Sequence, residues 1–554
     1  MARPEAEAEI HPLKAPEAPG GGARDAEKEA GGGGGAQPGR LSQWRTAAFF
    51  LSLYLCLGVA FAFSFVIPCP VRPASQAAWH RAYDGAAAYA FLAAGDADGD
   101  RVQDLIVAFQ AGPVPRNASG ADRDSCSGAG FAPPCAFLAA QSGTNGSTLW
   151  ERPVGQELLL MDCSVEHGGS PACLVLGSPP SLALLDLETG QTRWNEAANF
   201  GTNSTVLSPL LKIPDIDRDR VPDFLVFAAT GEEIKSFFYS AKFGTQMTFS
   251  GSLHLPGLVG HLSHVTKSGA CYVLFYTAEA LFAYSLKELY RRAAGPASPA
   301  LAILKEDADW EMAIQHRARQ VPLASSGDIQ YVTKMSEKPG SHILVARSAM
   351  LELVNGQQPS SLWVVEVPHI LREPVLGAFG PDEVAVAIES RVSREAKKVT
   401  IVEGSSGATR WEVELLSEGQ SPKPSTLATA DRRSVFLFWG LYQDKREETG
   451  PWPGGQQRLY LFHPSLPTVL LEMTNSTEPI VAFEGLLFER SRHACYVLLA
   501  GPPVGSSPGR VVLSKRKLKE DILSSRVVWL NQMPQDTDQN VRDYFHRMRF
   551  RTSG

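Results

Sequence analysis

The sequence has few cysteines and no excess of basic residues. Eight cysteines in 554 residues are too few for a disulfide scaffold of this size. The 52 Lys and Arg residues are outnumbered by 59 Asp and Glu residues, which gives a net charge of −7. Nucleic-acid binding normally needs a basic face, so this balance argues against a nucleic-acid partner. Apolar residues make up 44 % of the chain, which excludes a wholly disordered protein.

A single long apolar run lies near the N-terminus. Residues 47–67, AAFFLSLYLCLGVAFAFSFVI, form 21 residues without a charge. A helix of this length spans a hydrocarbon core of about 30 Å. A cleaved signal peptide is the alternative, but 46 residues precede the run, and the apolar region of a signal peptide is usually about 7–15 residues long. The sequence therefore predicts one uncleaved transmembrane helix.

The cysteines and the glycosylation sequons lie on one side of this run. Seven of the eight cysteines follow it, and Cys56 lies inside it, as expected of a domain in an oxidising compartment. All four N-x-S/T sequons also follow it, at Asn117, Asn145, Asn203 and Asn475. We therefore expect a type II membrane glycoprotein of the secretory pathway and cell surface, with a cytoplasmic N-terminus and a large C-terminal ectodomain.

Composition divides the rest of the chain into four segments. Residues 1–46 are rich in Gly, Ala, Pro and Glu, and we expect a disordered cytoplasmic tail. Residues 68–87 begin with Pro-Cys-Pro and are assigned to a stalk. Residues 88–530 alternate short apolar stretches with turn residues, which predicts a β-rich ectodomain. Residues 531–554 form a helical tail, in which 538–548 predict an amphipathic helix that docks on the ectodomain.

The ectodomain sequence contains a repeated unit of two apolar strands and their turns. Eight copies between Cys135 and Cys495 are spaced by about 51 residues, close to the length of a propeller blade. In the clearest copies Gly precedes Trp by four residues, as in Gly146 and Trp150, Gly190 and Trp194, and Gly407 and Trp411. A row of immunoglobulin-like sandwiches is the alternative, but the cysteine and tryptophan spacing is missing. The sequence predicts an all-β fold with one seven- to eight-bladed β-propeller, eight blades being preferred.

Two acidic loops share one spacing and flank apolar strands. Their sequences are DADGDRVQD and DIDRDRVPD, with carboxylates at positions 1, 3, 5 and 9: Asp96, Asp98, Asp100 and Asp104, and Asp215, Asp217, Asp219 and Asp223. Calcium prefers six to eight oxygen ligands, which alternate carboxylates in a tight loop supply. An EF-hand is excluded, because position 12 is valine in both loops. The sequence predicts structural Ca²⁺ at both loops, with an ordinary solvated acidic turn as the alternative.

These loops resemble the calcium loops of FG-GAP repeats in integrin α propellers, and the Gly-x-x-x-Trp turns resemble quinoprotein-type blades. FG-GAP loops usually carry Gly at position 6, where this chain has Arg101 and Arg220. Arg resists a positive φ and adds charge beside the ion, so we expect weaker binding or an empty second site.

Four segments extend the resemblance over most of the chain: RTAAFFLSLYLCL, FSFVIPCPVRPASQ, GSTLWERPV and LFHPSLP. They closely resemble the group of single-pass glycoproteins called family with sequence similarity 234. This resemblance implies a type II membrane protein with a β-propeller ectodomain, and it implies no particular activity.

Two pairs of cysteines each bracket a short loop and are candidates for disulfides. Cys126 and Cys135 enclose a Gly/Pro-rich loop, and Cys163 and Cys173 enclose EHGGSPA. Each bond would stabilise the fold by about 2–3 kcal/mol in the chain-entropy model. Cys69 is then left over beside the membrane, so a disulfide-linked dimer through Cys69 is a further hypothesis.

Motifs for catalysis are weak. The segment Gly505–Gly509 matches G-x-S-x-G, but two prolines precede it and a β-rich stretch follows, so a hairpin loop is expected instead of a nucleophile elbow. We therefore expect a non-enzymatic glycoprotein whose propeller binds a protein or glycan partner. The alternatives are a lumenal enzyme with a quinoprotein-like active site, or a structural or trafficking subunit of a membrane complex.

Overall fold

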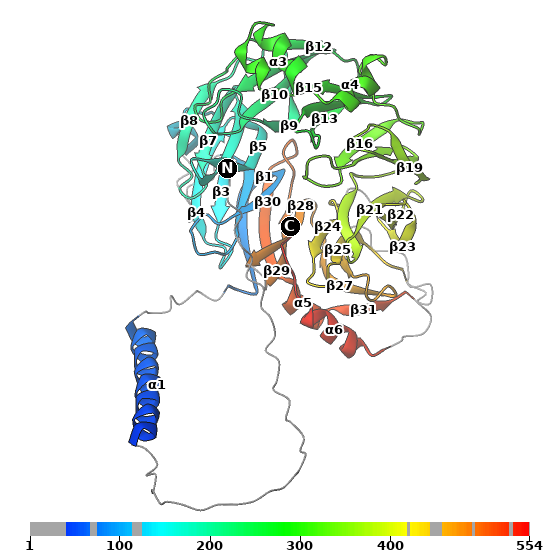
Figure 1. Ribbon diagram of the computed structural model, residues 1–554. Coiled ribbons are helices and arrows are strands. Elements are labelled where there is room, and N and C mark those ends of the chain that lie inside the picture. Colours follow the sequence, from blue (N-terminus) through cyan, green and yellow to red (C-terminus); the bar gives the residue numbers. More distant parts are fainter. Residues whose placement is uncertain are drawn as a thin grey trace, which may run out of the picture. The chain divides into compact units, whose positions relative to one another are not determined.

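The computed structural model describes residues 40–66, 75–112, 125–417, 421–443, 457–489, 493–530 and 536–552. The chain divides into two compact units between Arg72 and Pro73. The first contains one helix and the second contains all the strands (Figure 1).

Helix α1 (Arg40–Val66) contains the predicted transmembrane run. Its segment Trp44–Ala62 has a mean hydropathy of 1.7 and no buried residues, and it is long and apolar enough to cross a membrane. The helix begins seven residues before the predicted start, because residues 40–46 contain no Gly or Pro that would end it. Of the predicted disordered tail, residues 1–39 lie outside the described residues.

The strands of the second unit form seven sheets arranged in a ring (Figure 1). Six of them follow one another in chain order, and the first strand of each sheet packs beside that of a neighbouring sheet, as β9 does beside β13 and β24 beside β28. The strands of these six sheets are β5 (Glu157–His167), β6 (Ser170–Ser178), β7 (Ser181–Asp186), β8 (Thr192–Ala197); β9 (Thr205–Ile213), β10 (Asp223–Thr230), β11 (Glu233–Tyr239), β12 (Gly251–His254); β13 (Leu258–Val265), β14 (Cys271–Thr277), β15 (Leu281–Ser285); β16 (Ile329–Lys334), β17 (Ile343–Arg347), β18 (Met350–Val354), β19 (Ser361–Glu366); β20 (Val375–Gly380), β21 (Glu383–Arg391), β22 (Ala396–Glu403), β23 (Thr409–Leu416); and β24 (Ser425–Ala428), β25 (Ser434–Gly440), β26 (Gln457–Phe462), β27 (Val469–Ser476), β31 (Arg526–Trp529).

The seventh sheet joins the two ends of the strand-forming chain. Its order is β28-β29-β30-β1-β2-β3-β4. Strand β1 pairs with β30 through its first half and with β2 through its second half, because its register shifts near Asp84 and Ala86. The first strand thereby closes the ring. The strands of this sheet are β28 (Ile480–Glu489), β29 (His493–Ala500), β30 (Gly509–Lys517), β1 (Ala78–Gly95), β2 (Asp104–Ala111), β3 (Cys135–Gln141) and β4 (Thr148–Gly155).

This closure corrects the predicted stalk at 68–87. Residues from Ala78 onward belong to β1, and Trp79 and Tyr83 bury their rings in the core of the closing sheet. The strand therefore starts ten residues before the predicted boundary at residue 88. The β-propeller fold is confirmed, whereas the blade count stays a prediction because one sheet contains two arrays that share β1.

Tryptophans join neighbouring sheets, and in the closing sheet Trp79 joins β1 to the β3–β4 turn. The indole N–H of Trp79 donates to the carbonyl of Gly143 at 3.2 Å, and its ring covers Gly146. Trp150 donates to the carbonyl of Leu187 at 2.8 Å and covers Gly190. The same arrangement joins Trp194 to Ala241 and Gly244, and Trp363 to Gly404 and Gly407. In a Gly-x-x-x-Trp turn, therefore, the glycine receives one tryptophan and the tryptophan of the turn docks on the next sheet. The tryptophan that the glycine receives comes from a neighbouring sheet or, for Gly146, from β1 of the same sheet.

Helices replace the missing outer strand of the three-stranded sheet. After β15 the chain forms α3 (Leu286–Ala294), the 3₁₀ helix η1 (Pro299–Ala302) and α4 (Ala308–Gln315). Asp307 caps α4 through the N–H groups of Asp309 and Trp310. Trp310 is fully buried, and its indole N–H donates to the carbonyl of Gly356 at 3.1 Å. Helix α4 thus carries the tryptophan that an outer strand carries elsewhere.

The C-terminal segment packs against the last sheets. Helix α5 (Leu518–Ser524) precedes β31, and α6 (Asp538–Arg547) follows it; α2 (Ser125–Gly128) is a single turn elsewhere. Val541 and Phe545 of α6 are buried in the same core as Trp439 of β25. The predicted amphipathic helix at 538–548 is therefore present and docked, with Tyr544 of this helix 42 % exposed. Residues 531–535 and 553–554 lie outside the described residues.

Candidate metal centre

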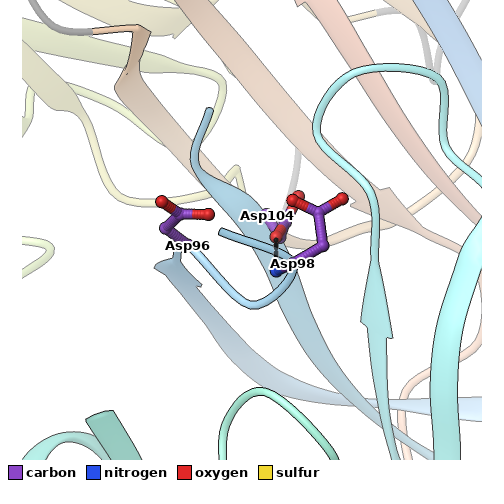
Figure 2. A group of neighbouring side chains, drawn as sticks. All are labelled: Asp96, Asp98 and Asp104. Atoms are coloured by element: carbon purple, nitrogen blue, oxygen red, sulfur yellow. Dashed lines mark hydrogen bonds between the residues drawn. The ribbon is translucent and has the colours of Figure 1, made fainter. Parts of the chain in front are cut away.

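The first acidic loop connects β1 to β2 and gathers three of its four predicted carboxylates. Asp96, Asp98 and Asp104 each place an oxygen within 4.8 Å of the others. Figure 2 shows the three carboxyl groups at the end of this hairpin. Asp104 is buried, Asp96 is half-buried and Asp98 is exposed. The cluster therefore opens to solvent on one side and is closed on the other.

Asp104 fixes the base of the loop. Its Oδ2 accepts hydrogen bonds from the backbone N–H groups of Ala97 at 2.7 Å and Asp98 at 3.2 Å. Its Oδ1 accepts one from the N–H of Gly143, in the turn between β3 and β4, at 2.8 Å. Burial outweighs these bonds and raises the pKa of Asp104 to about 6. Ionisation of Asp104 therefore costs more than ionisation of a solvated aspartate, and a cation beside it would lower that cost.

One carboxylate oxygen of Asp96 is available to a ligand, and the surroundings of Asp98 disfavour its ionised form. Oδ2 of Asp96 accepts from the N–H of Arg101 at 3.0 Å, whereas Oδ1 is buried without a hydrogen-bond partner in the described part of the chain. Burial and then the neighbouring carboxylates raise the pKa of Asp98, against the hydrogen bond from the N–H of Asp100.

Asp100 is not one of the three clustered carboxylates, although it lies close enough to Asp98 to raise the pKa of that residue. Its Oδ1 accepts from the N–H of Val102 at 2.7 Å, and its Oδ2 accepts from the hydroxyl of Thr144 at 2.8 Å. These bonds orient the carboxylate toward its own turn and toward the β3–β4 turn. The predicted ligand at position 5 is thus engaged within the protein.

The second loop, between β9 and β10, repeats the arrangement. Asp215, Asp217 and Asp223 form its cluster, with oxygens again within 4.8 Å. Oδ2 of Asp223 accepts from the N–H of Ile216 at 2.7 Å, and burial raises the pKa of Asp223 to about 6. Asp219 is engaged like Asp100, since its Oδ1 accepts from the N–H of Val221 at 2.8 Å and its Oδ2 from Ser240 at 3.5 Å.

The arginines at position 6 take a left-handed backbone conformation, which normally favours glycine. Arg101 has a φ of +69° and Arg220 a φ of +73°. Carboxylates at position 1 stabilise this conformation, because Asp96 and Asp215 accept hydrogen bonds from these two N–H groups at 3.0 and 2.8 Å. The expected resistance of Arg to positive φ therefore costs about 1–2 kcal/mol without preventing the fold. The second loop also holds Arg218 at +66°, where the first has Gly99.

Among the described residues, these two loops are the groups of His, Cys, Asp and Glu that are close enough to hold a metal ion. His261 and His264 are buried and instead bond the carbonyls of Pro209 and Gly356. The Gly505–Gly509 motif lies in the hairpin between β29 and β30, so the strand-to-helix turn of a nucleophile elbow is missing there.

The predicted disulfides and sequons map to the second unit. Cys126 bonds Cys135, and Cys163 bonds Cys173, so both predicted pairs are confirmed. Cys69, on which the dimer hypothesis depends, lies outside the described residues. The sequon side chains Asn145, Asn203 and Asn475 are exposed, and Asn117 lies outside the described residues.

Sequence reasoning missed the β3–β4 turn as part of the first site. Gly143 and Thr144 reach Asp104 and Asp100 from about 40 residues away in the sequence. The signal in the sequence is Gly146, which marks this turn without indicating that the turn contacts the acidic loop. A contact between two turns of one sheet cannot be predicted from the residue spacing within either turn.

Comparison with known proteins decides the family. A family model described as "FAM234A/B beta-propeller" matches residues 79–551. The chain belongs to the FAM234 family. Protein FAM234A of Homo sapiens is 41 % identical over 561 residues, which covers 99 % of this chain and 98 % of the human protein. Protein FAM234B of Gallus gallus is 28 % identical over 540 residues, which cover 93 % of this chain and 84 % of the Gallus gallus protein.

Solved structures resemble this FAM234 chain more distantly. The WD40 domain of SCAP from fission yeast matches with a TM-score of 0.38 and 11 % identity, covering 79 % of this chain and 98 % of that domain. BamB from Moraxella catarrhalis matches with a TM-score of 0.36 and 13 % identity, covering 68 % and 91 %. At TM-scores below 0.5 neither likeness extends to function.

Proposed function

We propose that this protein is a non-enzymatic type II membrane glycoprotein whose calcium-stabilised propeller binds a protein or glycan partner outside the cytoplasm. The observation that carries the proposal is a closed ring with two matching acidic loops in a chain that also has a helix of membrane-spanning length. A rigid ring of this kind suits the presentation of surface loops to a partner.

The compartment is supported by the covalent chemistry of the second unit. Two disulfides persist only where the surroundings are oxidising. The three described sequon asparagines are exposed, as glycan acceptors must be. Both features belong on the lumenal or extracellular side, which leaves the N-terminal residues in the cytoplasm and makes the cell surface the natural destination.

Calcium is supported by the donor set of each loop. Asp96, Asp98 and Asp104 supply hard oxygen ligands within one small volume, as Ca²⁺ prefers. Mutual repulsion and burial make the apo cluster unfavourable when it is ionised, and a divalent cation would remove that cost. The ion would be structural, holding the β1–β2 hairpin against the β3–β4 turn.

Thermal unfolding of the full-length protein in detergent tests the calcium part. We expect millimolar Ca²⁺ to stabilise the propeller by about 1–2 kcal/mol relative to chelator, as for extracellular sites with dissociation constants of about 10⁻⁴–10⁻³ M. Asp98→Ala should remove the contribution of the first loop, and Asp217→Ala the smaller contribution of the second. Asp84→Ala, at an exposed acid outside both loops, is the control. An unchanged unfolding temperature in Ca²⁺ would refute calcium binding.

Binding of the fluorescently labelled protein to intact cells tests the partner. We expect saturable binding that falls when calcium is chelated. Trypsin or glycosidase treatment of the cells then separates a protein partner from a glycan. Binding that does not saturate, or that survives both treatments, would contradict the proposal.

A further inference from the structure

A groove with both polar and apolar lining lies between the C-terminal segment and the β24–β25 turn. Its volume is about 620 Å³, and it is lined chiefly by Asp431 of the turn and by Asn540, Tyr544, Arg547 and Arg549 of the C-terminal segment. This volume falls in the range of sites that bind small ligands. The two acidic loops do not contribute to it.

The walls of the groove are held by the fold. The N–H of Ala430 donates to the carbonyl of Arg549 at 2.8 Å, and the N–H of Arg551 donates to that of Ala428 at 2.9 Å. Beneath the helix, Val541 and Phe545 are buried. The side chains that face the groove are therefore presented from a fixed backbone, which lowers the entropy cost of binding.

The acidic side chains of the groove are already satisfied. Oδ1 of Asp431 accepts from the hydroxyl of Thr429 at 2.5 Å, and Oδ2 accepts from the guanidinium of Arg433 at 2.9 Å. The other carboxylate that lines the groove, Asp536, accepts from the side-chain amide of Asn540 at 2.7 Å.

The cationic side chains of the groove, by contrast, are not satisfied by partners within the protein. The guanidinium of Arg549 makes no hydrogen bond or ion pair with any residue that the structure describes. Arg547 lies 3.9 Å from Asp543 and its side chain is 79 % exposed. The charge left for a ligand is therefore positive, and a guanidinium fork matches a carboxylate in a bidentate way.

The neighbouring groups indicate what carries that carboxylate. Tyr544 is 42 % exposed and offers an aromatic face and a hydroxyl, and Asn540, whose amide nitrogen donates to Asp536, offers its amide oxygen. A ligand ring that stacks on an aromatic face while its hydroxyl groups hydrogen-bond to an amide is typical of a sugar. A compact groove also fits one or two sugar rings better than an extended acidic peptide.

We propose that this groove binds a carboxylate-bearing sugar at the end of a glycan, with Arg549 holding the carboxylate and Tyr544 supporting the ring. The assignment rests on the proposed function, of which it names the partner class. Of the two partner classes in that proposal, protein and glycan, the assignment makes glycan the class that this face of the propeller recognises.

Direct binding to the full-length protein tests the assignment, with sialyllactose as the probe, lactose as the neutral control and hexaglutamate as the acidic peptide. We expect sialyllactose to bind and lactose to bind at least tenfold more weakly. Arg549→Gln should weaken sialyllactose binding about tenfold or more, as for the loss of one charged hydrogen-bond pair. Arg551→Gln is the matched control, since Arg551 is exposed two residues away and outside the groove.

The outcomes separate this proposal from the broader one. Equal binding of lactose, tighter binding of hexaglutamate, or no effect of Arg549→Gln would each overturn the groove assignment. If Arg549→Gln and sialidase treatment both leave calcium-dependent cell binding intact, the assignment fails while the proposed function stands. If the wild-type protein binds sialyllactose but no cells, the groove assignment stands and the broader proposal fails.

Discussion

Gly146 and Gly168 share a backbone conformation but have different surroundings. Their φ values are +76° and +62°. A Cβ on Gly146 would lie 2.5 Å from the ring of Trp79, whereas a Cβ on Gly168 would meet nothing within 4 Å. The pair therefore separates the cost of positive φ from the cost of displacing a tryptophan that joins β1 to the β3–β4 turn of the closing sheet.

We expect Gly168→Ala to lower the free energy of unfolding by about 1 kcal/mol, through conformational strain alone. Gly146→Ala should cost about 2–4 kcal/mol, because strain is added to a clash that moves the Trp79 ring. Denaturant unfolding of both variants measures the difference. Equal losses would show that Trp79 does not hold β1 against the β3–β4 turn.

The acidic loops show how far residue spacing predicts a site. The positions of Asp96, Asp98 and Asp104 were predicted, and the structure brings these three together. The spacing treated Asp100 as their equal, but Asp100 bonds Val102 and the β3–β4 turn instead. Backbone N–H groups that compete for a carboxylate depend on local dihedral angles, which spacing does not specify.

At the scale of elements, a helix can supply the tryptophan contact that an outer strand supplies in other sheets. Helix α4 brings Trp310 to the carbonyl of Gly356 and stacks it on Tyr272 at a centroid distance of 5.2 Å. The sheet β13-β14-β15 has three described strands, and this helix adds to the direct contact that β13 and β14 make with β16 of the following sheet.

We expect Trp310→Ala to destabilise the protein by about 3–5 kcal/mol, because a fully buried indole leaves a large cavity. Trp310→Phe should cost less, since it keeps most of the ring and loses the N–H bond to Gly356. Met312→Ala on the same helix is the control, because Met312 is 69 % exposed. Comparable losses at Trp310 and Met312 in denaturant unfolding would contradict this role for α4.

The sequence repeat predicted the hairpins, but it did not predict which residues of other sheets the hairpins contact. The four-residue step from Gly146 to Trp150 correctly indicated β-turns in a propeller. The partner of each tryptophan lies much further along the chain, as Leu187 does from Trp150. The helices after β15 also interrupt the repeat, and their tryptophan lacks the glycine signature. Contacts between repeats depend on how the sheets stack, which no single repeat contains.

At the scale of the whole molecule, one peptide joins the first acidic loop to the closure of the ring. The N–H of Gly143 donates to Asp104, and its carbonyl accepts from Trp79 of β1 and from the ammonium of Lys515 of β30, the latter at 2.8 Å. The second loop has no such link to the closing strands among the described residues. Folding of the first loop and closure of the ring are therefore linked.

The proposed type II orientation predicts that the whole propeller is glycosylated and protected in intact microsomes. We expect deglycosylation to remove mass from the wild-type protein, and Asn145→Gln, Asn203→Gln and Asn475→Gln each to remove one step of that shift. Ser147→Ala should repeat the effect of Asn145→Gln, because it destroys the same sequon and keeps the asparagine. An unglycosylated propeller that external protease digests would reverse the orientation.

The split pairing of β1 has a consequence for biosynthesis. Ala78 is among the first propeller residues to be made, and its partner Arg516 follows about 440 residues later. At typical synthesis rates of about 5–20 residues per second, the first half of β1 waits roughly 20–90 s for its partner strand. During that time an unpaired strand bearing Trp79 and Tyr83 is open to wrong pairing. Yield in a cell should therefore depend on chaperones that shield this strand until the last sheet emerges.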